Sequence, residues 1–453
     1  MPAQIVWFRR DLRVRDHPAL AAAAAAGDVL PLFIIDPAFE GAGVPRSQAL
    51  RLALEALRSA TDGALVIRRG SPEQIIPELV REVDAGAVHI SGETTPGGRR
   101  RDARVARALE EFDVPLVPTG TPYAVSPGRV RKGDGDPFRV FTPFFRAWRE
   151  HGWRAPAQMP ERWRWVRSIE SEDLPEERET DARLEWAAEP QALKRWQEFL
   201  EEPINDYDAA RDRPDLDGTS RMSIGLKFGT VHPRTLLADL EDAAPHRSPA
   251  ARQSFTRFQA ELAWREFYAD VLWHHPASAW QDYGDQLRAM PYEEPGEEFD
   301  AWRAGRTGFP MVDAGMRQLL GEGWMHNRVR MLTASFMTKD LHLWWPHGAK
   351  HFLQHLADGD LASNNHGWQW VAGTGTDASP YFRVFNPVLQ GQKFDPRGDY
   401  VRRWVPELRH LAGAAVHEPW KHEDGYSHGY PQRIVDHAEE RREALSRLEA
   451  AKA

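Results

Sequence analysis

The sequence predicts a two-part fold, with an α/β N-terminal domain followed by an all-α C-terminal domain. Short apolar runs alternate with helix-length stretches up to residue 117, which predicts a doubly wound, Rossmann-like parallel sheet. Beyond residue 191 the strand pattern stops and the apolar spacing becomes helical. The chain has 453 residues, of which 42% are hydrophobic, so it can fill more than one core.

The predicted sheet has five strands, each a short run of apolar residues. A strand that is covered by helices on both faces is apolar throughout, so such runs are typical of parallel sheets. The expected strands are residues 5–8, 29–35, 64–67, 87–90 and 115–117, with helices at 18–26, 48–60, 72–85 and 101–112. No Gly-x-Gly-x-x-Gly turn follows the first strand, so dinucleotide binding at that turn is not expected.

The predicted domain boundaries fall near residues 128 and 198. Residues 1–128 form the α/β domain, and residues 129–198 are expected to be a connector because they are rich in Pro, Trp and Arg with weak periodicity. Residues 199–453 form the helical domain. Helices are expected there at 255–273, 311–320, 327–343 and 350–358, with a charged helix in the tail 433–453.

The composition excludes several classes of chemistry. Cysteine is absent, which excludes disulfides, thiolate nucleophiles and Cys-ligated metals, so redox chemistry would need an organic cofactor or Trp and Tyr. No apolar run reaches the eighteen or so residues of a membrane span and the first twelve residues carry charge, which predicts a cytoplasmic protein without membrane contact. The net charge of -9 argues against non-specific polyanion binding, although a local basic groove is compatible with it.

Residues 358–370 suggest redox photochemistry. Asp358 and Asp360 can bind ribose hydroxyls or a ring nitrogen, an amide of the pair Asn364-Asn365 can hydrogen-bond a heterocycle, and Trp368 and Trp370 carry easily oxidised indoles. A flavin would use all three groups, whereas the alternative is an ordinary buried helix with tryptophan filler. The two indoles diverge by about 200° on a helix, so one can face a cofactor and the other a substrate cavity.

Three further clusters carry candidate residues. Glu261, Trp264 and Arg265 share one helix face at i, i+3 and i+4, which suits a polar aromatic ligand or a salt-bridged surface helix. Trp324, Asn327, Arg328 and Met331 are expected on one helical stripe, and leaving the amide buried and unpaired would cost roughly 1–3 kcal/mol. The segment 219–223, with Tyr207 and Arg211 before it, can hold a pyrophosphate or simply cap a helix.

No metal site is expected. His326 and His366 are interpreted as structural, because neither stands at a zinc-site spacing from a second His or a carboxylate.

Several sequence motifs resemble those of the photolyase and cryptochrome family and follow one another in the same order. The resemblance covers nearly the whole chain and is closest to the class I cyclobutane pyrimidine dimer photolyases. Residues 7–13 are similar to the family's opening strand and turn. The remaining blocks follow in family order at 218–223, 261–268, 307–313, 323–339, 358–376 and 385–387.

The resemblance implies that FAD is bound in the helical domain, in a U-shape. The residues implied to bind it are Tyr207, Thr219, Ser220, Arg221, Met222, Ser223, Trp324, Asn327, Arg330, Asp358, Asp360 and Asn364. Asn364 matches the residue that faces flavin N5, where an amide, unlike a carboxylic acid, supports the fully reduced anionic flavin. Reduced FAD is therefore the expected working form.

The resemblance also implies DNA containing pyrimidine dimers as the substrate, and light-driven electron transfer from reduced FAD as the mechanism. The residues implied for the dimer pocket and the DNA are Arg211, Glu261, Trp264, Arg265, Asn327, Arg328, Met331, Trp370, Arg383 and Gln390. A dimer flipped from the duplex loses stacking, which Trp264 and Trp370 can replace. Glu261 could donate a proton after electron arrival. Met331 stands where (6-4) enzymes have His, which favours cyclobutane dimers.

Two departures from the family pattern concern electron donors and the antenna. Photoreduction would use Trp368 first and Trp345 second, but the third, surface tryptophan aligns best with Tyr292, with Trp302 ten residues on. Residues 93–99 lack the Asn-Glu pair of folate-binding members. Arg46 and Lys227 match deazaflavin-binding positions, and Glu93 is a further candidate. The resemblance therefore favours 8-hydroxy-deazaflavin over folate as a second chromophore. The alternative is that the antenna site is empty.

Two other functions remain open at this point. A cryptochrome-like blue-light receptor would share the FAD fold without repair, and an unrelated nucleotide-binding protein would carry no flavin. We expect a monomer without an obligate protein partner, associated with the nucleoid when bound to damaged DNA.

Overall fold

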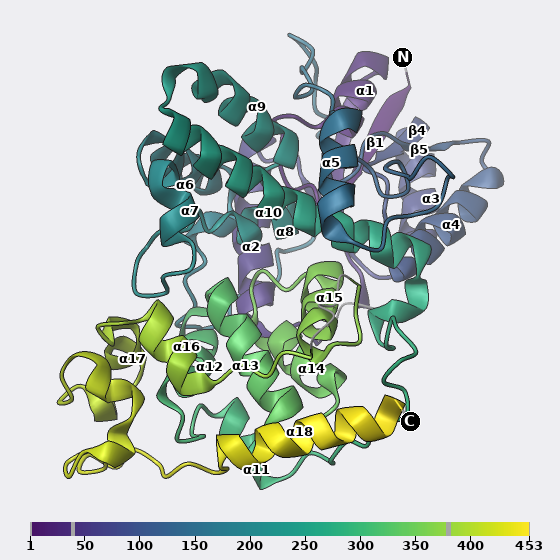
Figure 1. Cartoon of the computed structure of the whole chain (residues 1–453). Helices are drawn as coiled ribbons and strands as arrows, with labels where there is room; N and C mark the ends of the chain where they lie inside the picture. Colours follow the sequence, from purple (N-terminus) through teal and green to yellow (C-terminus); the bar gives the residue numbers. More distant parts are fainter. Residues whose placement is uncertain (1, 38–40, 377–381, 453) are drawn as a thin grey trace. The chain divides into compact units, whose positions relative to one another are not determined.

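The computed structural model describes residues 2–37, 41–376 and 382–452. By packing, the chain divides into two compact units (Figure 1). The first unit comprises Met1–Thr180, Leu184–Asn205 and Ser220–Pro276, and the second comprises Asp181–Arg183, Asp206–Thr219 and Ala277–Ala453. These units group the chain by contacts, and the domain boundaries near residues 128 and 198 stay a prediction.

The sheet of the first unit is parallel and five-stranded, as predicted. Its order is β3-β2-β1-β4-β5, so the first strand lies at the centre. The strands are β1 Ala3–Phe8, β2 Val29–Ile35, β3 Val66–Arg69, β4 Ala85–Ile90 and β5 Leu116–Pro118. The connecting helices are α1 Pro18–Ala26, α2 Val44–Ala60, α3 Pro72–Val83 and α4 Pro96–Glu110.

Part of the segment expected to be a connector is helical. Helix α5 spans Phe141–His151 and helix α6 spans Glu189–Glu201. The buried side chains of α5 are Phe141, Phe144 and Trp148, which recur at helical spacing and pack inward. The sequence analysis did not predict α5, because the flanking Pro and Arg residues obscured this short apolar stripe.

Three more α-helices lie in the first unit. They are α8 Met222–Phe228, α9 Pro233–Ala243 and α10 Pro249–His274. Helix α10 packs against α5.

The second unit is helical. Its core is formed mainly by α12 Pro310–Glu322, α13 Asn327–Lys339, α14 Trp345–His355 and α15 Leu361–Ala372. The other α-helices are α7 Tyr207–Ala210, α11 Glu297–Arg303, α16 Pro387–Phe394, α17 Asp399–Trp404 and α18 His437–Lys452. In the described part of the chain, no helix combines the length and the apolarity needed to cross a bilayer.

Two helix ends in this unit differ from the prediction. Helix α13 ends at Lys339 rather than at residue 343, and α14 runs from Trp345 to His355 rather than over 350–358. His342 has a positive φ of 54°, which stops the helical run before α14. Pro346 then lies in the first turn of α14, where its missing N–H costs nothing.

Candidate functional site

The start of α13 separates the residues that were expected to share one stripe. His326 caps the helix, with Nδ1 accepting a hydrogen bond from the backbone N–H of Arg328 at 3.2 Å. Trp324 therefore precedes the helix and is buried, whereas Asn327 is the first helical residue and is exposed. The predicted stripe from Trp324 to Met331 was wrong, and an exposed amide carries no penalty for lacking a partner.

Arg330 and Asp358 form the best-defined charged pair of the site. Arg330 donates from Nη2 to Asp358 Oδ2 at 2.8 Å and from Nε to the carbonyl of Met325 at 2.7 Å. The Asp358 side chain is 2% exposed, and its Oδ1 has no hydrogen-bond partner among the described residues. Because a buried carboxylate oxygen normally accepts a hydrogen bond, this atom suits a ligand hydroxyl.

Asp360 and Asn364 lie on the first turn of α15. Asp360 is the N-cap residue, and its Oδ1 accepts from the backbone N–H of Ser363 at 3.0 Å. The half-buried Asn364 donates from Nδ2 to the carbonyl of Ala349 at 3.2 Å and to Asn365 Oδ1 at 2.8 Å. Both amide protons are thus engaged within the protein, so the oxygen of Asn364 is the atom suited to a ligand.

Buried polar residues of α15 hold the helix in place. Asn365 donates to the carbonyl of Ala279, His366 shares a hydrogen bond with Ser278 Oγ at 2.9 Å, and Gln369 donates to the carbonyl of Ser278 at 2.8 Å. Gln369 also accepts from the backbone N–H of Tyr283 at 2.8 Å. Sequence reasoning missed Gln369. Asn365 was expected as part of an amide pair for a ligand, but its amide group donates to backbone here. The structural interpretation of His366 agrees with these contacts.

Trp368 is buried in the aromatic core of the second unit, whereas Trp370 is half-buried. The Trp368 ring meets Phe352 and Trp302 edge-on, with centroid distances of 4.9 Å and 6.1 Å. Gly348 of α14 leaves room for this ring, because a Cβ there would overlap Cη2 of Trp368. The two indoles therefore differ in environment, as their spacing along the helix predicted.

Trp345 and Tyr292 differ in their surroundings. Trp345 is fully buried and donates from Nε1 to Asp282 Oδ1 at 2.7 Å. Tyr292 is half-buried, and burial raises the pKa of its hydroxyl, with the nearby charge of Asp282 adding to the effect. Trp302 is fully buried and donates to the carbonyl of Thr333, so it does not fit the role of a surface donor.

Arg211 and Arg328 meet at one carboxylate that sequence reasoning missed. Arg328 donates from Nη2 to Asp212 Oδ1 at 2.8 Å, and Arg211 Nε lies 3.8 Å from the same oxygen. The guanidinium of Arg211 also lies 5.9 Å from the ring centre of Tyr207. Asp212 therefore holds two of the candidate DNA-contacting cations together.

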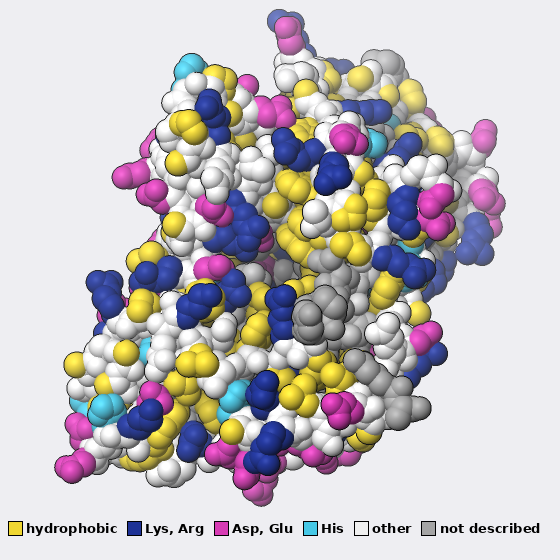
Figure 2. Space-filling model, viewed as in Figure 1, with side chains coloured by type: hydrophobic (Ala, Val, Ile, Leu, Met, Phe, Trp, Pro, Cys, Tyr) yellow, Lys and Arg dark blue, Asp and Glu magenta, His cyan; other side chains and the backbone are white. Residues whose placement is uncertain are grey.

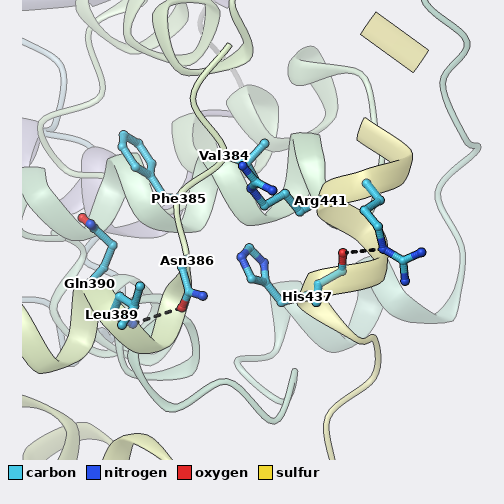
Figure 3. A pocket seen from close by; sticks show the side chains of 9 residues that line it. Val384, Phe385, Asn386, Leu389, Gln390, His437 and Arg441 are labelled. Atoms are coloured by element: carbon cyan, nitrogen blue, oxygen red, sulfur yellow. Dashed lines mark hydrogen bonds between the residues drawn. The ribbon is translucent and has the colours of Figure 1, made fainter. Parts of the chain in front are cut away.

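A pocket of about 600 Å³ lies between the start of α16 and the start of α18 (Figure 3). Phe385, Gln390 and Arg441 are among its lining residues, so it combines an aromatic ring, an amide and a cation. Asn386 caps α16 by accepting from two backbone N–H groups, which fixes the rim. Arg383, just before this segment, is exposed, and its carbonyl accepts from Lys339 Nζ at 2.5 Å.

In the first unit, Trp264 is stacked on Phe141 of α5. The ring centroids are 3.7 Å apart and the planes differ by 7°. Hydrophobic side chains gather at the surface where α5 meets α10 (Figure 2). Trp264 and Glu261 are both half-buried on α10, as their shared face predicted.

Arg265 and Glu266 of α10 are structural anchors. Arg265 donates to the carbonyls of Pro122 and Leu226 at 3.0 and 3.1 Å, so its guanidinium holds backbone rather than Glu261. Glu266 is buried and accepts from the backbone N–H groups of Ala124 and Val125 and from Trp148 Nε1. Burial raises the pKa of Glu266 to about 7, against the lowering effect of these hydrogen bonds.

The segment expected to hold a pyrophosphate spans both units. Thr219 belongs to the second unit, and the residues from Ser220 onward belong to the first. Arg221 takes a left-handed conformation with a φ of 59° before α8, and Ser220 Oγ accepts from the backbone N–H of Met222 at 3.3 Å. Ser223 is exposed on the first turn of α8.

The candidate antenna residues all lie in the first unit. Arg46 is on α2, where burial lowers its pKa, and Lys227 is on α8. Glu93 is held by the backbone N–H groups of Thr94 and Thr95 at 2.7 and 3.0 Å, and it lies 3.8 Å from Arg10 Nη1. Glu93 therefore organises the turn before α4.

Comparisons with known proteins agree with the resemblance. Residues 4–161 match the family model described as DNA photolyase, and residues 258–450 match the FAD binding domain of DNA photolyase. The deoxyribodipyrimidine photo-lyase of Streptomyces griseus is 41% identical, with 97% of this chain and 98% of that protein covered.

Two solved structures are similar over their whole length. A bacterial class III photolyase from Agrobacterium tumefaciens has a TM-score of 0.90 and 35% identity, covering 100% of this chain and 98% of that one. An archaeal photolyase from Sulfolobus tokodaii, described with two FAD molecules and a novel light-harvesting cofactor, has a TM-score of 0.82 and 27% identity, covering 99% of both chains.

Proposed function

We propose that this chain, which belongs to the DNA photolyase family, repairs cyclobutane pyrimidine dimers in DNA under blue light with FAD as its cofactor. The observation that carries the proposal is the buried Asp358 carboxylate in the FAD-binding domain. Its Oδ2 is fixed by Arg330, and its Oδ1 has no hydrogen-bond partner among the described residues. A buried carboxylate oxygen that lacks a donor, such as Oδ1, can accept a hydrogen bond from a ribose hydroxyl of FAD.

The residues of α15 fit the ring system of the same cofactor. Reduced FAD, when bound and excited by light, supplies one electron to the dimer and receives it back after the ring bonds have opened. Asn364 has both amide protons engaged by Ala349 and Asn365, so its oxygen can accept a ring N–H. An amide has no proton to release near neutral pH, which supports the reduced form as the working state.

Trp264 is proposed to stack on the extruded dimer. Phe141 covers one face of the indole at 3.7 Å, so a base can use only the other face. Stacking of a base on an aromatic side chain contributes about 1–3 kcal/mol, which compensates for part of the lost stacking in the duplex. Glu261, one helical turn before Trp264 on α10, can hydrogen-bond the imide edge of thymine.

The second unit carries the cations proposed to neutralise phosphates beside the lesion. Arg211 and Arg328 are held at Asp212, and Arg383 is exposed before the pocket that Gln390 lines. Cations held in fixed positions can order a phosphate backbone without reading its sequence. Met331, half-buried on α13, cannot relay a proton, which favours cyclobutane dimers over (6-4) products.

A second chromophore, 8-hydroxy-deazaflavin rather than folate, is proposed for the first unit, with Arg46 and Lys227 as its contacts. Glu93 already accepts hydrogen bonds from the backbone of its own turn. It is therefore proposed to shape the chromophore site rather than to contact the chromophore. Reconstitution with the purified deazaflavin tests this proposal. Its binding should add an absorption band, and light absorbed in that band should excite FAD by energy transfer.

The repair proposal is tested with an oligonucleotide containing one thymine dimer. The purified protein, loaded with FAD and chemically reduced, should restore the thymines under blue light and not in the dark. A protein that binds FAD but restores no thymines would instead support the receptor function. A protein that binds no flavin would exclude both functions.

A further inference from the structure

We infer that Trp344, and not Tyr292, is the outermost electron donor for photoreduction of the bound flavin, and that Asp282 positions it. This inference rests on the proposed function, because the donors serve a purpose only if the chain binds a light-excited flavin. Trp344 was not among the residues that the sequence indicated. It lies directly before Trp345, at the start of α14.

The geometry joins both indoles to one carboxylate. The rings of Trp344 and Trp345 have centroids 6.4 Å apart and planes at 66°. Asp282 Oδ1 accepts a hydrogen bond from Trp345 Nε1 at 2.7 Å and from Trp344 Nε1 at 3.3 Å. Electron transfer between two rings in such proximity needs no intervening residue.

The difference in solvent exposure between the two indoles favours electron transfer from Trp344 to oxidised Trp345. Trp345 is fully buried, whereas Trp344 is partly exposed. An indole that has lost an electron carries a positive charge, which is more stable where water can solvate it. Since both rings share the charge of Asp282, exposure to solvent is the difference that favours a hole on Trp344.

The electron and proton balance closes on these residues. With FAD bound and excited by light, one electron would pass to it from Trp368. An electron from Trp345 would then reduce Trp368, and an electron from Trp344 would reduce Trp345. The oxidised Trp344 loses the proton on Nε1 to Asp282, and from there the proton passes to water. The net change in the protein would be a neutral tryptophanyl radical at Trp344, with one electron delivered to the cofactor, and an added thiol would later reduce the radical.

The surroundings of Tyr292 do not suit it to be the outermost electron donor. Oxidation of a phenol is favourable only if its proton leaves at the same time, and a protein acceptor within hydrogen-bond distance speeds this loss. Within residues 2–37, 41–376 and 382–452, the Tyr292 hydroxyl makes no hydrogen bond. Burial and the charge of Asp282 also raise the pKa of this hydroxyl, which holds the proton more tightly.

The test is flash photolysis of the protein loaded with oxidised FAD, followed by transient absorption and electron paramagnetic resonance. The variants are Trp344→Phe, Tyr292→Phe and, as a matched control, Trp280→Phe, which removes another partly exposed indole of the second unit. In the unaltered protein the long-lived radical should be a tryptophanyl radical. Trp344→Phe should shorten its lifetime and lower the photoreduction rate by about tenfold or more, because the charge stays on a buried ring.

Tyr292→Phe and Trp280→Phe should leave both the radical spectrum and its lifetime unchanged. A tyrosyl radical in the unaltered protein, or a lifetime that only Tyr292→Phe shortens, would overturn the inference. Equal losses in the Trp344 and Tyr292 variants would also overturn it, because Trp344 would then not be the outermost donor. A photoreduction rate that neither variant changes would show that the chain ends at Trp345.

Asp282 is tested separately as a positioning residue. Asp282→Asn keeps a hydrogen-bond acceptor but removes the charge and the base. The radical of Trp344 should then keep its proton longer, because its hydrogen-bond partner can no longer accept that proton. The repair assay on the unaltered, chemically reduced protein uses none of these donors, so failure of the proposed function is seen there independently.

Discussion

Phe141 of α5 lies flat against the indole of Trp264 on α10, with ring centroids 3.7 Å apart and planes 7° from parallel. A further ring on the same helix, Phe145, continues this stack at 5.7 Å from Phe141. One face of Trp264 is therefore occupied within the protein. The orientation of the other face is fixed before any substrate arrives.

The first prediction concerns this stack. Phe141→Leu should weaken binding of dimer-containing DNA by roughly 3- to 10-fold, because an aromatic pair contributes about 0.5–1.5 kcal/mol beyond its buried area. Fluorescence anisotropy with a labelled oligonucleotide measures the effect. Phe145→Leu is the matched control, since it makes the same change on the same helix without touching Trp264. Equal affinities of the Phe141 variant and the unaltered protein would contradict a positioning role.

The second prediction concerns the space around Trp368. Gly348→Ala would place a Cβ over the Trp368 ring and 2.6 Å from the Met337 sulfur, so the core must shift. Overpacking of this kind costs about 1–3 kcal/mol, which chemical denaturation can measure. The shift should also change the near-ultraviolet circular dichroism of the buried indole.

Gly367→Ala is the control for this change. Gly367 lies one residue before Trp368 on α15, and a Cβ there would meet nothing within 4 Å. Since Ala is the better helix former, this variant should gain roughly 0.5–1 kcal/mol of stability. If both variants were equally stable, Gly348 would not be required for the close approach of the ring.

The third prediction concerns Asp358. Asp358→Asn removes the ionic partner of the Arg330 guanidinium, and one of the two acceptor oxygens becomes a donor. FAD affinity should fall by about tenfold or more, or about 1.4 kcal/mol, and equilibrium dialysis with the flavin spectrum measures it.

Asp399→Asn gives the comparison for Asp358. Asp399 makes a similar ion pair with Arg402 at 2.7 Å, but it is exposed, at the start of α17. An exposed pair contributes about 0–1 kcal/mol, so neither FAD affinity nor stability should change much. Unchanged FAD affinity in the Asp358 variant, with its thermal midpoint intact, would remove this carboxylate from the site.

The sheet and the long helices could be predicted because their signals are local. The run 29–35 coincides with β2, and the spacing of apolar residues located α10 and α12. Helix α5 was missed because its apolar stripe is short and its flanks are rich in Pro and Arg. A helix or strand was therefore predicted where a long enough pattern of apolar residues lies within one uninterrupted stretch of chain.

The candidate site was predictable only for residues that a family pattern carries. Asp212, Asp282 and Phe141 were missed, because each acquires its role from a partner far away in the sequence. Trp324 was assigned to a helix because its spacing to Asn327 is helical. The His326 cap that starts α13 after Trp324 could be recognised only from the local backbone.

The last prediction concerns the buried Glu266 carboxyl group. Burial raises its pKa from 4.5 to about 7 in the folded protein, so the folded state binds a proton that the unfolded state has lost between these two values. Stability should therefore fall as pH rises from 4.5 to 7, by about 3 kcal/mol for this group alone. Glu266→Gln keeps an acceptor for Trp148 Nε1 and cannot ionise, so its stability should lose this part of the pH dependence.

Urea unfolding at several pH values separates this group from the rest of the chain. The difference in unfolding free energy between Glu266→Gln and the unaltered protein should increase in favour of the variant from pH 5 to 8, where the carboxylate becomes charged. Glu241→Gln, an exposed change at the end of α9, should show no such trend. Parallel pH profiles for Glu266→Gln and the unaltered protein would mean that hydrogen bonds from Trp148, Ala124 and Val125 offset the cost of burial.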